Sequence, residues 1–311
     1  MTTVKRRTSR KILVDPSSPD HEFAIEGLSD YLAVMHLLFK SISQVLSDAC
    51  GLTTLQYRML LRLLATNGKP MRTTDLADTL YVGASTVSAA VPRLVEEGLV
   101  RRHEDPDDMR VVSLSLERAG FDEIERADLC VGEFLQEYWK NLTPKQLETG
   151  LASSVNAVRL HGAERIENGR ARLDTAFFDT IMISRTLTTQ HLDEAGLRTQ
   201  EMRILLASRI LGPRITATQL ARYLFLKSSD MTAPLKILEL KGYITRERAD
   251  ENRRIKLVSL TPEGSKKVEE LLPATFDALL ETCHSSEKAV QIHLSAAQNV
   301  IARERAATLF S

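Results

Sequence analysis

The chain has 311 residues, with 41 basic and 41 acidic side chains, 43% hydrophobic residues and three cysteines. This length and apolar content suit two domains with their own cores and exclude a wholly disordered chain, and three cysteines are too few for a disulfide framework. No apolar run approaches the roughly 20 residues that cross a bilayer, and no apolar signal core follows the basic start. We therefore expect a cytoplasmic protein with no membrane partner.

The net charge of zero is at first sight unfavourable for nucleic-acid binding, which usually leaves an excess of Lys and Arg. This neutrality conceals an uneven distribution. Residues 1–170 carry 21 basic and 24 acidic side chains, whereas residues 171–311 carry 20 and 17. The second part of the chain is therefore the more basic.

In chain order, residues 1–20 come first, a basic segment with Pro and Ser that we expect to be a disordered tail. Apolar residues then recur every three or four positions from Leu28 to Leu46, which predicts a long helix that ends before Gly51. Further helices are expected at about 54–65, 73–80 and 85–97, strands at about 100–104 and 111–116, a long helix at about 119–139, and a last helix capped by Thr143-Pro144. Gly98 suits the left-handed cap that ends the 85–97 helix.

The segment that begins at Gly51 recurs later in the chain. Residues 51–61 (GLTTLQYRMLL) align with residues 196–206 (GLRTQEMRILL) at an offset of 145. After a one-residue deletion the match continues at an offset of 144 and pairs Gly98 with Gly242 and Gly120 with Gly264. A repeat at a fixed offset indicates that one structural unit is present twice. We therefore divide the chain into the tail (1–20), a first unit (21–169) and a second unit (170–311), with Ser285-Ser286 as the cap of the last helix.

Each unit has the order helix, helix, helix and two-stranded hairpin, which is that of a winged helix-turn-helix. The most distinctive stretches are Leu76-Ala77, Ser85-Thr86-Val87-Ser88, residues 94–102 (LVEEGLVRR) and 105–110 (DPDDMR), with 220–221 (LA), 241–244 (KGYI), 251–254 (ENRR) and 257–264 (LVSLTPEG) in the second unit. In order and spacing these stretches resemble the MarR (multiple antibiotic resistance regulator) family of transcriptional regulators. The resemblance extends over about residues 21–310.

The resemblance implies a mainly α fold with small β-hairpin wings. Family members bind DNA as dimers whose terminal helices interlock and whose two winged lobes straddle the duplex. Because the second lobe is tethered here, the resemblance implies two tandem winged helix-turn-helix units arranged as an intramolecular pseudo-dimer with a shared helical dimerisation-type domain. The oligomeric state stays open between a monomer that acts as a pseudo-dimer and a homodimer.

The resemblance also implies that the helices near Ser85 and Ser229 enter successive major grooves of a double-stranded DNA operator. Ser and Thr bind phosphates or base edges, Arg and Lys bind guanine or phosphate, and Ala contacts a thymine methyl group. The candidates are Ser85, Thr86, Ser88, Ala89 and Arg93 in the first unit, and Lys227, Ser228, Ser229, Thr232 and Lys236 in the second. Helix capping is the alternative role of Ser85 and Ser229, and Asp230 is expected to cap rather than to read a base. Pro92 and Pro234 are expected inside these helices, where proline favours a kink.

In the family, a wing arginine reaches the minor groove and an acid two residues earlier fixes the wing loop. Asp108 and Arg110 occupy these positions in the first unit, and Asn252 and Arg254 in the second, where Arg253 adds a cation. We therefore predict three DNA-binding arginines and two wing-stabilising residues, and a surface ion pair is the alternative role. Cations outnumber acids only in the second wing, so the second lobe is expected to hold phosphate more strongly.

The resemblance finally implies a pocket between the terminal-helix domain and each lobe for a small aromatic or phenolic effector. The sequence thus predicts a DNA-binding regulator, a repressor released by a ligand, with two non-identical lobes that read two operator half-sites. The alternative is a winged-helix protein-interaction scaffold that has lost sequence-specific DNA binding. No phosphate loop, paired-cysteine zinc spacing or nucleophile elbow is present, so we expect no enzyme activity, cofactor or metal. We expect Cys50, Cys130 and Cys283 to be buried apolar residues rather than redox sensors.

Overall fold

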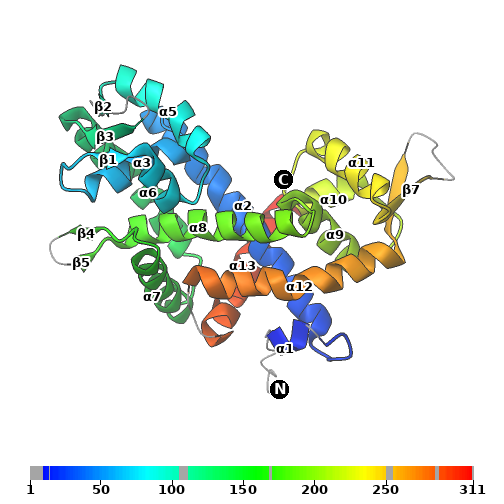
Figure 1. The fold of residues 1–311 in the computed structure, drawn as a ribbon. Coiled ribbons are helices and arrows are strands. Elements are labelled where there is room, and N and C mark those ends of the chain that lie inside the picture. The colour runs from blue at the N-terminus through cyan, green and yellow to red at the C-terminus, as the bar shows by residue number, and fades with distance from the viewer. Residues whose placement is uncertain are drawn as a thin grey trace. The chain divides into compact units, whose positions relative to one another are not determined.

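The computed structural model describes residues 10–13, 15–104, 111–167, 170–249, 255–283 and 287–309. Within these residues the chain is mainly helical, with two three-stranded sheets and one two-stranded sheet (Figure 1). The chain divides into two compact units. The first-wing unit comprises Leu38–Ile183, and the second-wing unit comprises Met1–Leu37 and Ser184–Ser311.

Two long helices, α2 (His21–Cys50) and α8 (Leu173–Glu194), contribute residues to both units. The other elements of the first-wing unit are α3 (Thr54–Leu64), β1 (Met71–Arg72), α4 (Thr73–Leu80), α5 (Ala84–Glu96), β2 (Val100–Glu104), β3 (Val112–Leu116), α6 (Arg118–Trp139), α7 (Pro144–Leu160), β4 (Ile166–Glu167) and β5 (Arg170–Ala171). Those of the second-wing unit are α1 (Arg10–Leu13), α9 (Thr199–Leu211), β6 (Ile215–Thr216), α10 (Ala217–Tyr223), the 3-10 helix η1 (Ser228–Met231), α11 (Thr232–Leu240), β7 (Ile244–Arg248), β8 (Lys256–Leu260), α12 (Pro262–Cys283) and α13 (Glu287–Leu309). The predicted mainly α fold with two tandem winged helix-turn-helix units is confirmed.

The two wings have the same topology. Each is an antiparallel sheet, in the order β1-β3-β2 in the first-wing unit and β6-β8-β7 in the second-wing unit. Val100 faces Leu116 in the first wing, and Ile244 faces Leu260 in the second, so the register is also shared. The hairpin strands were predicted, whereas β1 and β6 were not, because two residues are too few to show an alternating pattern.

One glycine in each repeat, Gly120 or Gly264, allows the wing to pack closely on the helix that follows it. A Cβ atom on Gly120 would lie 2.2 Å from the Leu99 carbonyl oxygen, and one on Gly264 would lie 2.0 Å from the Tyr243 carbonyl oxygen. Only glycine allows backbone to approach this closely. The predicted left-handed cap at Gly98 is also confirmed, with φ of 68°.

Each unit has its own core. In the second-wing unit the N-terminal part of α2 packs with α9, α10, α11 and α12, and Leu28, Met202 and Phe276 are completely buried there. In the first-wing unit, the fully buried rings of Tyr57 and Phe178 lie 5.1 Å apart, centroid to centroid. Residues of α2 up to Leu37 therefore belong with the second repeat, so the compact units differ from the sequence division at residue 170.

The N-terminal segment departs from expectation. Residues 10–13 lie in the tail expected to be disordered but form α1, because the apolar Ile12 packs on the core of the second-wing unit. The carbonyl oxygen of Ile12 also lies 2.9 Å from Nδ1 of His21. Residues 1–9 lie outside the described residues.

The helix ends agree well with the sequence. The predicted Thr143 cap of α7 is confirmed, since its hydroxyl accepts from the Gln146 N–H at 3.3 Å and the Gln146 side chain accepts from the Thr143 N–H at 2.9 Å. The expected cap at Ser285-Ser286 lies outside the described residues. In the described part of the chain, no helix is long and apolar enough to cross a membrane.

Candidate functional site

Helix α5 exposes a face of small side chains. Val87, Val91 and Leu94 are buried and anchor the helix in the lobe. The opposite, exposed face carries the predicted residues Ser85, Thr86, Ser88 and Ala89. The α5 face, as we call these four residues, places small polar groups and one methyl group where a flat partner can approach the helix closely.

The second-wing unit presents an equivalent surface on η1 and α11. Met231, Leu235 and Leu238 are buried at the repeat positions of the three α5 anchors. The exposed residues, which we call the α11 face, are Lys227, Ser228, Ser229, Thr232 and Lys236. The structure therefore brings both predicted sets together, each on one side of a helix, and only the α11 face is basic.

The capping interpretation is wrong for both serines. Gly83 is the N-cap of α5, so Ser85 is already the second residue of the helix. Ser229 lies inside η1, whose N-cap is Lys227. Asp230 does cap, as expected, because its carboxylate accepts from the backbone N–H of Lys227 at 3.3 Å. The Asp230 carboxylate thus accepts a hydrogen bond within its own turn.

The two prolines differ in position. Pro92 is the ninth residue of α5 and is interior, as predicted. Pro234 is only the third residue of α11, where a backbone N–H has no acceptor in the helix, so proline removes no hydrogen bond there. The Asp230 carbonyl oxygen four residues earlier accepts instead from Gln200 Nε2 at 2.9 Å. Pro234 therefore lies within α11, as predicted, but in its first turn.

Arg93 differs from the other candidates because its exposed guanidinium group already has two partners in the same lobe. Its Nη2 donates to the Gly51 carbonyl oxygen at 2.7 Å, and its Nε lies 2.8 Å from the Glu97 carboxylate. In the second repeat Lys241 takes over this contact and donates to the Gly196 carbonyl oxygen at 2.8 Å. In each lobe a cation near the C-terminal end of the exposed helix thus bonds to the loop that precedes α3 or α9.

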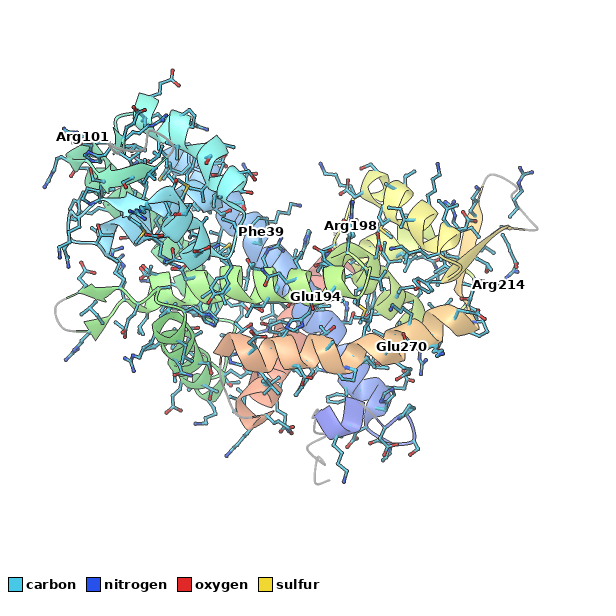
Figure 2. All side chains as sticks on the ribbon, viewed as in Figure 1. Phe39, Arg101, Glu194, Arg198, Arg214 and Glu270 are labelled. Carbon is cyan, nitrogen blue, oxygen red and sulfur yellow. The ribbon has the colours of Figure 1, made fainter. Side chains whose placement is uncertain are left out.

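The wing tips, residues 105–110 and 250–254, lie outside the described residues. The predicted roles of Arg110, Arg253, Arg254, Asp108 and Asn252 therefore stay predictions. On the described strands, Arg101 pairs with Glu117 at 2.6 Å and Arg102 pairs with Glu104 at 3.0 Å; Figure 2 marks Arg101 on the first wing. Both of these arginines on the described strands therefore have a carboxylate partner.

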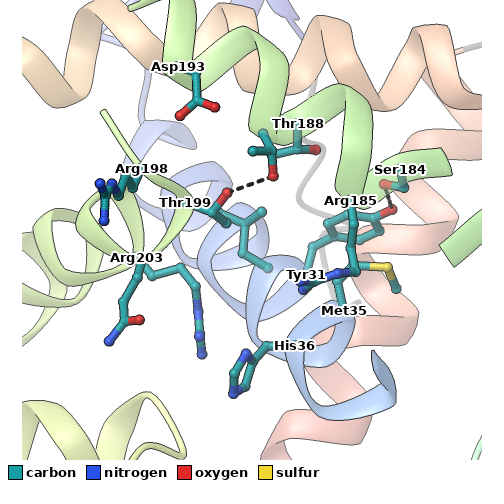
Figure 3. Close-up of a pocket in the computed structure, with 13 residues that line it drawn as sticks. Tyr31, Met35, His36, Ser184, Arg185, Thr188, Asp193, Arg198, Thr199 and Arg203 are labelled. Carbon is teal, nitrogen blue, oxygen red and sulfur yellow. Dashed lines mark hydrogen bonds between the residues drawn. The ribbon is translucent and has the colours of Figure 1, made fainter. Parts of the chain in front are cut away.

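The second-wing unit contains a cavity of about 430 Å³ (Figure 3). Helices α2, α8 and α9 line it with Tyr31, Leu32, Met35, His36, Ser184, Arg185, Thr188, Thr189, Asp193, Arg198, Thr199, Gln200 and Arg203. The Tyr31 hydroxyl lies 3.0 Å from the Ser184 hydroxyl, and the hydroxyls of Thr189 and Thr199 lie 3.2 Å apart. The walls combine apolar side chains, hydroxyls and three arginines with one carboxylate.

Arg203 is the most unusual side chain of this cavity. It is 3% exposed, and its Nη2 donates to the Leu224 carbonyl oxygen at 2.7 Å. Its Nε has no hydrogen-bond partner among the described residues. Burial, and then the nearby charge of Arg185, lower the Arg203 pKa to about 10. A buried cation without a carboxylate is costly unless a ligand compensates it.

In the first-wing unit the equivalent buried arginine is paired with an internal carboxylate. Arg58, at the repeat position of Arg203, donates from Nε to the Asp179 carboxylate at 3.1 Å, and Arg62 donates to it at 2.9 Å. Asp179 is completely buried. Burial alone would raise the Asp179 pKa, but the guanidinium groups of Arg62 and Arg58 bring it below its ordinary value. Sequence reasoning missed both arginine sites, although the alignment of Arg58 with Arg203 was available in the repeat.

The surroundings of one described cysteine, Cys50, disfavour reactivity. Cys50 and Cys130 are free and half-buried, and burial raises the Cys50 pKa, which disfavours the reactive thiolate. The Cys283 side chain lies outside the described part of the structure. Within that part, no group of three or more His, Cys, Asp or Glu side chains is placed to hold a metal ion.

Comparison with known proteins points to one family. The MarR family model matches the chain twice, over residues 51–110 and 195–255. The HTH-type transcriptional regulator YwoH of Bacillus subtilis is 35% identical over 82 residues, which are 26% of this chain and 58% of YwoH. A second regulator of that organism, YhbI, is 24% identical over 123 residues, 40% of this chain and 79% of YhbI. The chain thus spans less than two thirds of the first of these relatives.

Among solved structures, a MarR family transcriptional regulator from Streptomyces coelicolor, in complex with DNA, is 30% identical. The alignment covers 37% of this chain and 72% of that chain, with a TM-score of 0.34.

The helix order, the exposed helix before each hairpin and the shared wing register define a protein with two winged helix-turn-helix lobes. The family model matches each lobe in the corresponding part of the repeat. The chain therefore belongs to the MarR family of winged helix-turn-helix transcriptional regulators.

Proposed function

We propose that this chain is a DNA-binding transcriptional regulator, a repressor that a small-molecule ligand releases from its operator. Its two non-identical lobes read two half-sites from one chain. The observation that carries the proposal is the pair of exposed faces, on α5 and on η1 and α11, at the same position of each repeat. The relatives named as HTH-type transcriptional regulators support the regulatory role.

The chemistry of the two faces suits DNA. A helix enters the major groove when its exposed side chains are small enough for close approach and polar enough to bond base edges and phosphates. The α5 face supplies hydroxyls and the Ala89 methyl group. The α11 face adds the ammonium groups of Lys227 and Lys236, which bind phosphate and release counterions.

The difference between the faces supports recognition of two unlike half-sites. Identical lobes favour a palindrome, because each lobe makes the same contacts. Here a neutral face and a basic face lie on one chain, so the preferred operator is asymmetric. The second half-site contributes more of the salt-dependent affinity.

The cavity of the second-wing unit supports control by a ligand. It has the volume and the mixed apolar and polar walls of a small-molecule site. A ligand bound there changes DNA affinity if it prefers one conformation of the lobe over another. The ligand releases the protein from DNA if the conformation that it prefers binds DNA less well.

The test uses the full chain and the DNA upstream of its own gene, with binding followed by fluorescence anisotropy. Ala89→Glu and Ala233→Glu place one negative charge at equivalent exposed positions of α5 and α11. Each is expected to weaken binding by about 1–3 kcal/mol, through repulsion of phosphate and loss of close approach. Ala119→Glu, at an exposed position of α6, is the control and is expected to bind normally.

The repressor role has its own readout. Addition of the protein to a purified transcription system is expected to lower the transcript from this promoter, whereas Ala89→Glu is expected to restore it. Absence of DNA binding even at low salt contradicts the proposal and favours the protein-interaction scaffold. Increased transcription would leave DNA binding intact but contradict repression.

A further inference from the structure

The segment that joins the two repeats is bonded to the first winged lobe. We call residues 161–172, between α7 and α8, the connector; the structure describes 161–167 and 170–172 of it (Figure 1). We propose that the connector is a strap that holds α4 and α5 in the orientation that binds DNA, with His161 and Arg165 as positioning residues. This inference rests on the proposed DNA binding by the α5 face and adds the part of the chain that fixes its position.

A buried carboxylate fastens the connector to the lobe. Asp128 of α6 is 2% exposed. One of its oxygens accepts from Arg165 Nη1 at 2.5 Å and lies 3.4 Å from Arg172 Nη1. Its other oxygen accepts from the Tyr57 hydroxyl of α3. Because an unpaired charge in the interior is costly, these partners are needed. The connector thus supplies two arginines to a buried cluster that joins α3 and α6.

The start of the connector contacts the turn of the helix-turn-helix. Tyr81 is the C-cap of α4, and only Val82 and Gly83 separate it from the first residue of α5. The Tyr81 hydroxyl is hydrogen-bonded to His161 Nδ1, and the two rings are T-shaped with centroids 5.3 Å apart. Tyr81 has φ of 56°, which is unfavourable for a residue with a Cβ atom unless its surroundings hold it. His161 is therefore placed to hold the turn from which α5 begins.

The second-wing unit holds its equivalent turn differently. At the offset of 144, Phe225 lies at the position of Tyr81 and shares its φ of 56°, but it has no hydroxyl to bond a histidine. At the same offset His161 corresponds to Arg305 of α13, whose guanidinium group stacks on the Tyr223 ring at 4.1 Å. Loss of the strap should therefore affect the first lobe alone.

Hydrogen-deuterium exchange of the full chain without DNA tests the strap itself. His161→Phe keeps an aromatic ring but removes the hydrogen bond to α4, and Arg165→Gln removes one cation from the buried cluster. Each is expected to raise amide exchange at residues 81–87 by at least about fivefold, with residues 225–231 unchanged. Arg170→Gln, an exposed arginine of the same connector, is the matched control and should exchange like the wild type. Faster exchange confined to the connector, or unchanged exchange, overturns the proposal.

A double-mutant cycle with the upstream DNA assigns the effect to one lobe. His161→Phe and Arg165→Gln are each expected to weaken binding by about fivefold, and Arg165→Lys to restore most of the affinity. With α5 already disabled by Ala89→Glu, the same changes should have little further effect, whereas with Ala233→Glu they should keep their full effect. A loss of equal size in both backgrounds would indicate general destabilisation and overturns the proposal.

The two experiments separate the strap from the proposed function. If the wild-type chain binds no DNA, the proposed function fails, and the exchange experiment still decides whether the connector holds the turn. If the wild-type chain binds DNA and the His161 and Arg165 variants bind it equally well, DNA binding stands and the strap proposal fails.

Discussion

The two compact units place an arginine at the same point of the same helix and satisfy it in opposite ways. In the first-wing unit Arg58 and Arg62 enclose the buried carboxylate of Asp179. In the second-wing unit Arg203 faces a cavity, with a backbone carbonyl as its only hydrogen-bond acceptor among the described residues. The difference teaches that one buried position of a duplicated helix can be neutralised by an internal carboxylate in one copy and line a cavity in the other.

The exposed helices repeat this division. The α5 face is neutral and Arg93 is occupied by Glu97 and the Gly51 carbonyl oxygen. The α11 face keeps the exposed Lys227 and Lys236. The first-wing unit therefore pairs these cations within the unit in both places, whereas Lys227 and Lys236 of the second-wing unit are exposed.

The largest effect is expected from removal of the internal carboxylate. Asp179→Asn keeps the shape but leaves two buried guanidinium groups without a counter-ion, which should lower the free energy of unfolding by about 3 kcal/mol. Urea unfolding at pH 7 measures this loss. The control is Asp193→Asn, an exposed acid of the second-wing cavity, which should change stability by less than about 0.5 kcal/mol.

The pH dependence of the same variant has a definite sign. Because the folded-state pKa of Asp179 lies below its ordinary value, its contribution is complete above about pH 4 and is lost as the pH falls through the folded-state value. The wild type should therefore lose stability in acid more steeply than Asp179→Asn. Parallel stability curves would show that Asp179 is not ionised in the folded protein.

A shorter side chain sharpens the comparison between the units. Asp179→Ala makes room beside Arg58 and Arg62, so a small external carboxylate should be able to bind there in place of the missing side chain. Acetate at ten times its dissociation constant should then recover about 1.4 kcal/mol of unfolding free energy. Acetamide at the same concentration is the control, and equal recovery by both would indicate nonspecific stabilisation.

Much of the fold was predictable from local pattern. The repeat located both lobes, because close backbone contact requires the glycines at 120 and 264 and the left-handed caps favour glycine at 98 and 242. Hydrophobic spacing located the helices. The pairing of residues up to Leu37 with the second repeat was not predictable, since both repeats offer an apolar surface to the same helix.

The candidate site was predicted only in part. Exposure of the two faces follows from helical periodicity, because the buried Val87 and Met231 leave their neighbours outside. Capping by Gly83 involves a residue without a side chain, and the hydrogen bond of Arg93 is made to the backbone of the distant Gly51, so neither leaves a local signal. Asp179 is separated from Arg62 by 117 positions and from Arg58 by 121 positions in the sequence, and no local signal relates these residues.

A smaller effect should appear equally in both units when the close glycine is replaced. Gly120→Ala and Gly264→Ala each force a methyl group against a carbonyl oxygen, at 2.2 and 2.0 Å before relaxation. Each should lower the free energy of unfolding by about 2 kcal/mol, because the wing must shift away from its helix. Thermal or urea unfolding measures the loss, with Gly83→Ala as a control whose Cβ has no neighbour closer than 3.7 Å. A large loss in only one unit would show that the wings are not packed alike.

The smallest effect should distinguish the two exposed faces. Each lysine that binds phosphate contributes about 0.9 to the slope of log affinity against log salt. Lys227→Gln and Lys236→Gln should therefore each flatten the slope by about 0.9, with a loss of affinity of about 1 kcal/mol at moderate salt. Arg93→Gln in the first-wing unit should leave the slope almost unchanged, because that charge is already paired with Glu97. Anisotropy titrations at four salt concentrations measure the three slopes, and an equal decrease for Arg93→Gln would show that the two lobes contribute alike to phosphate binding.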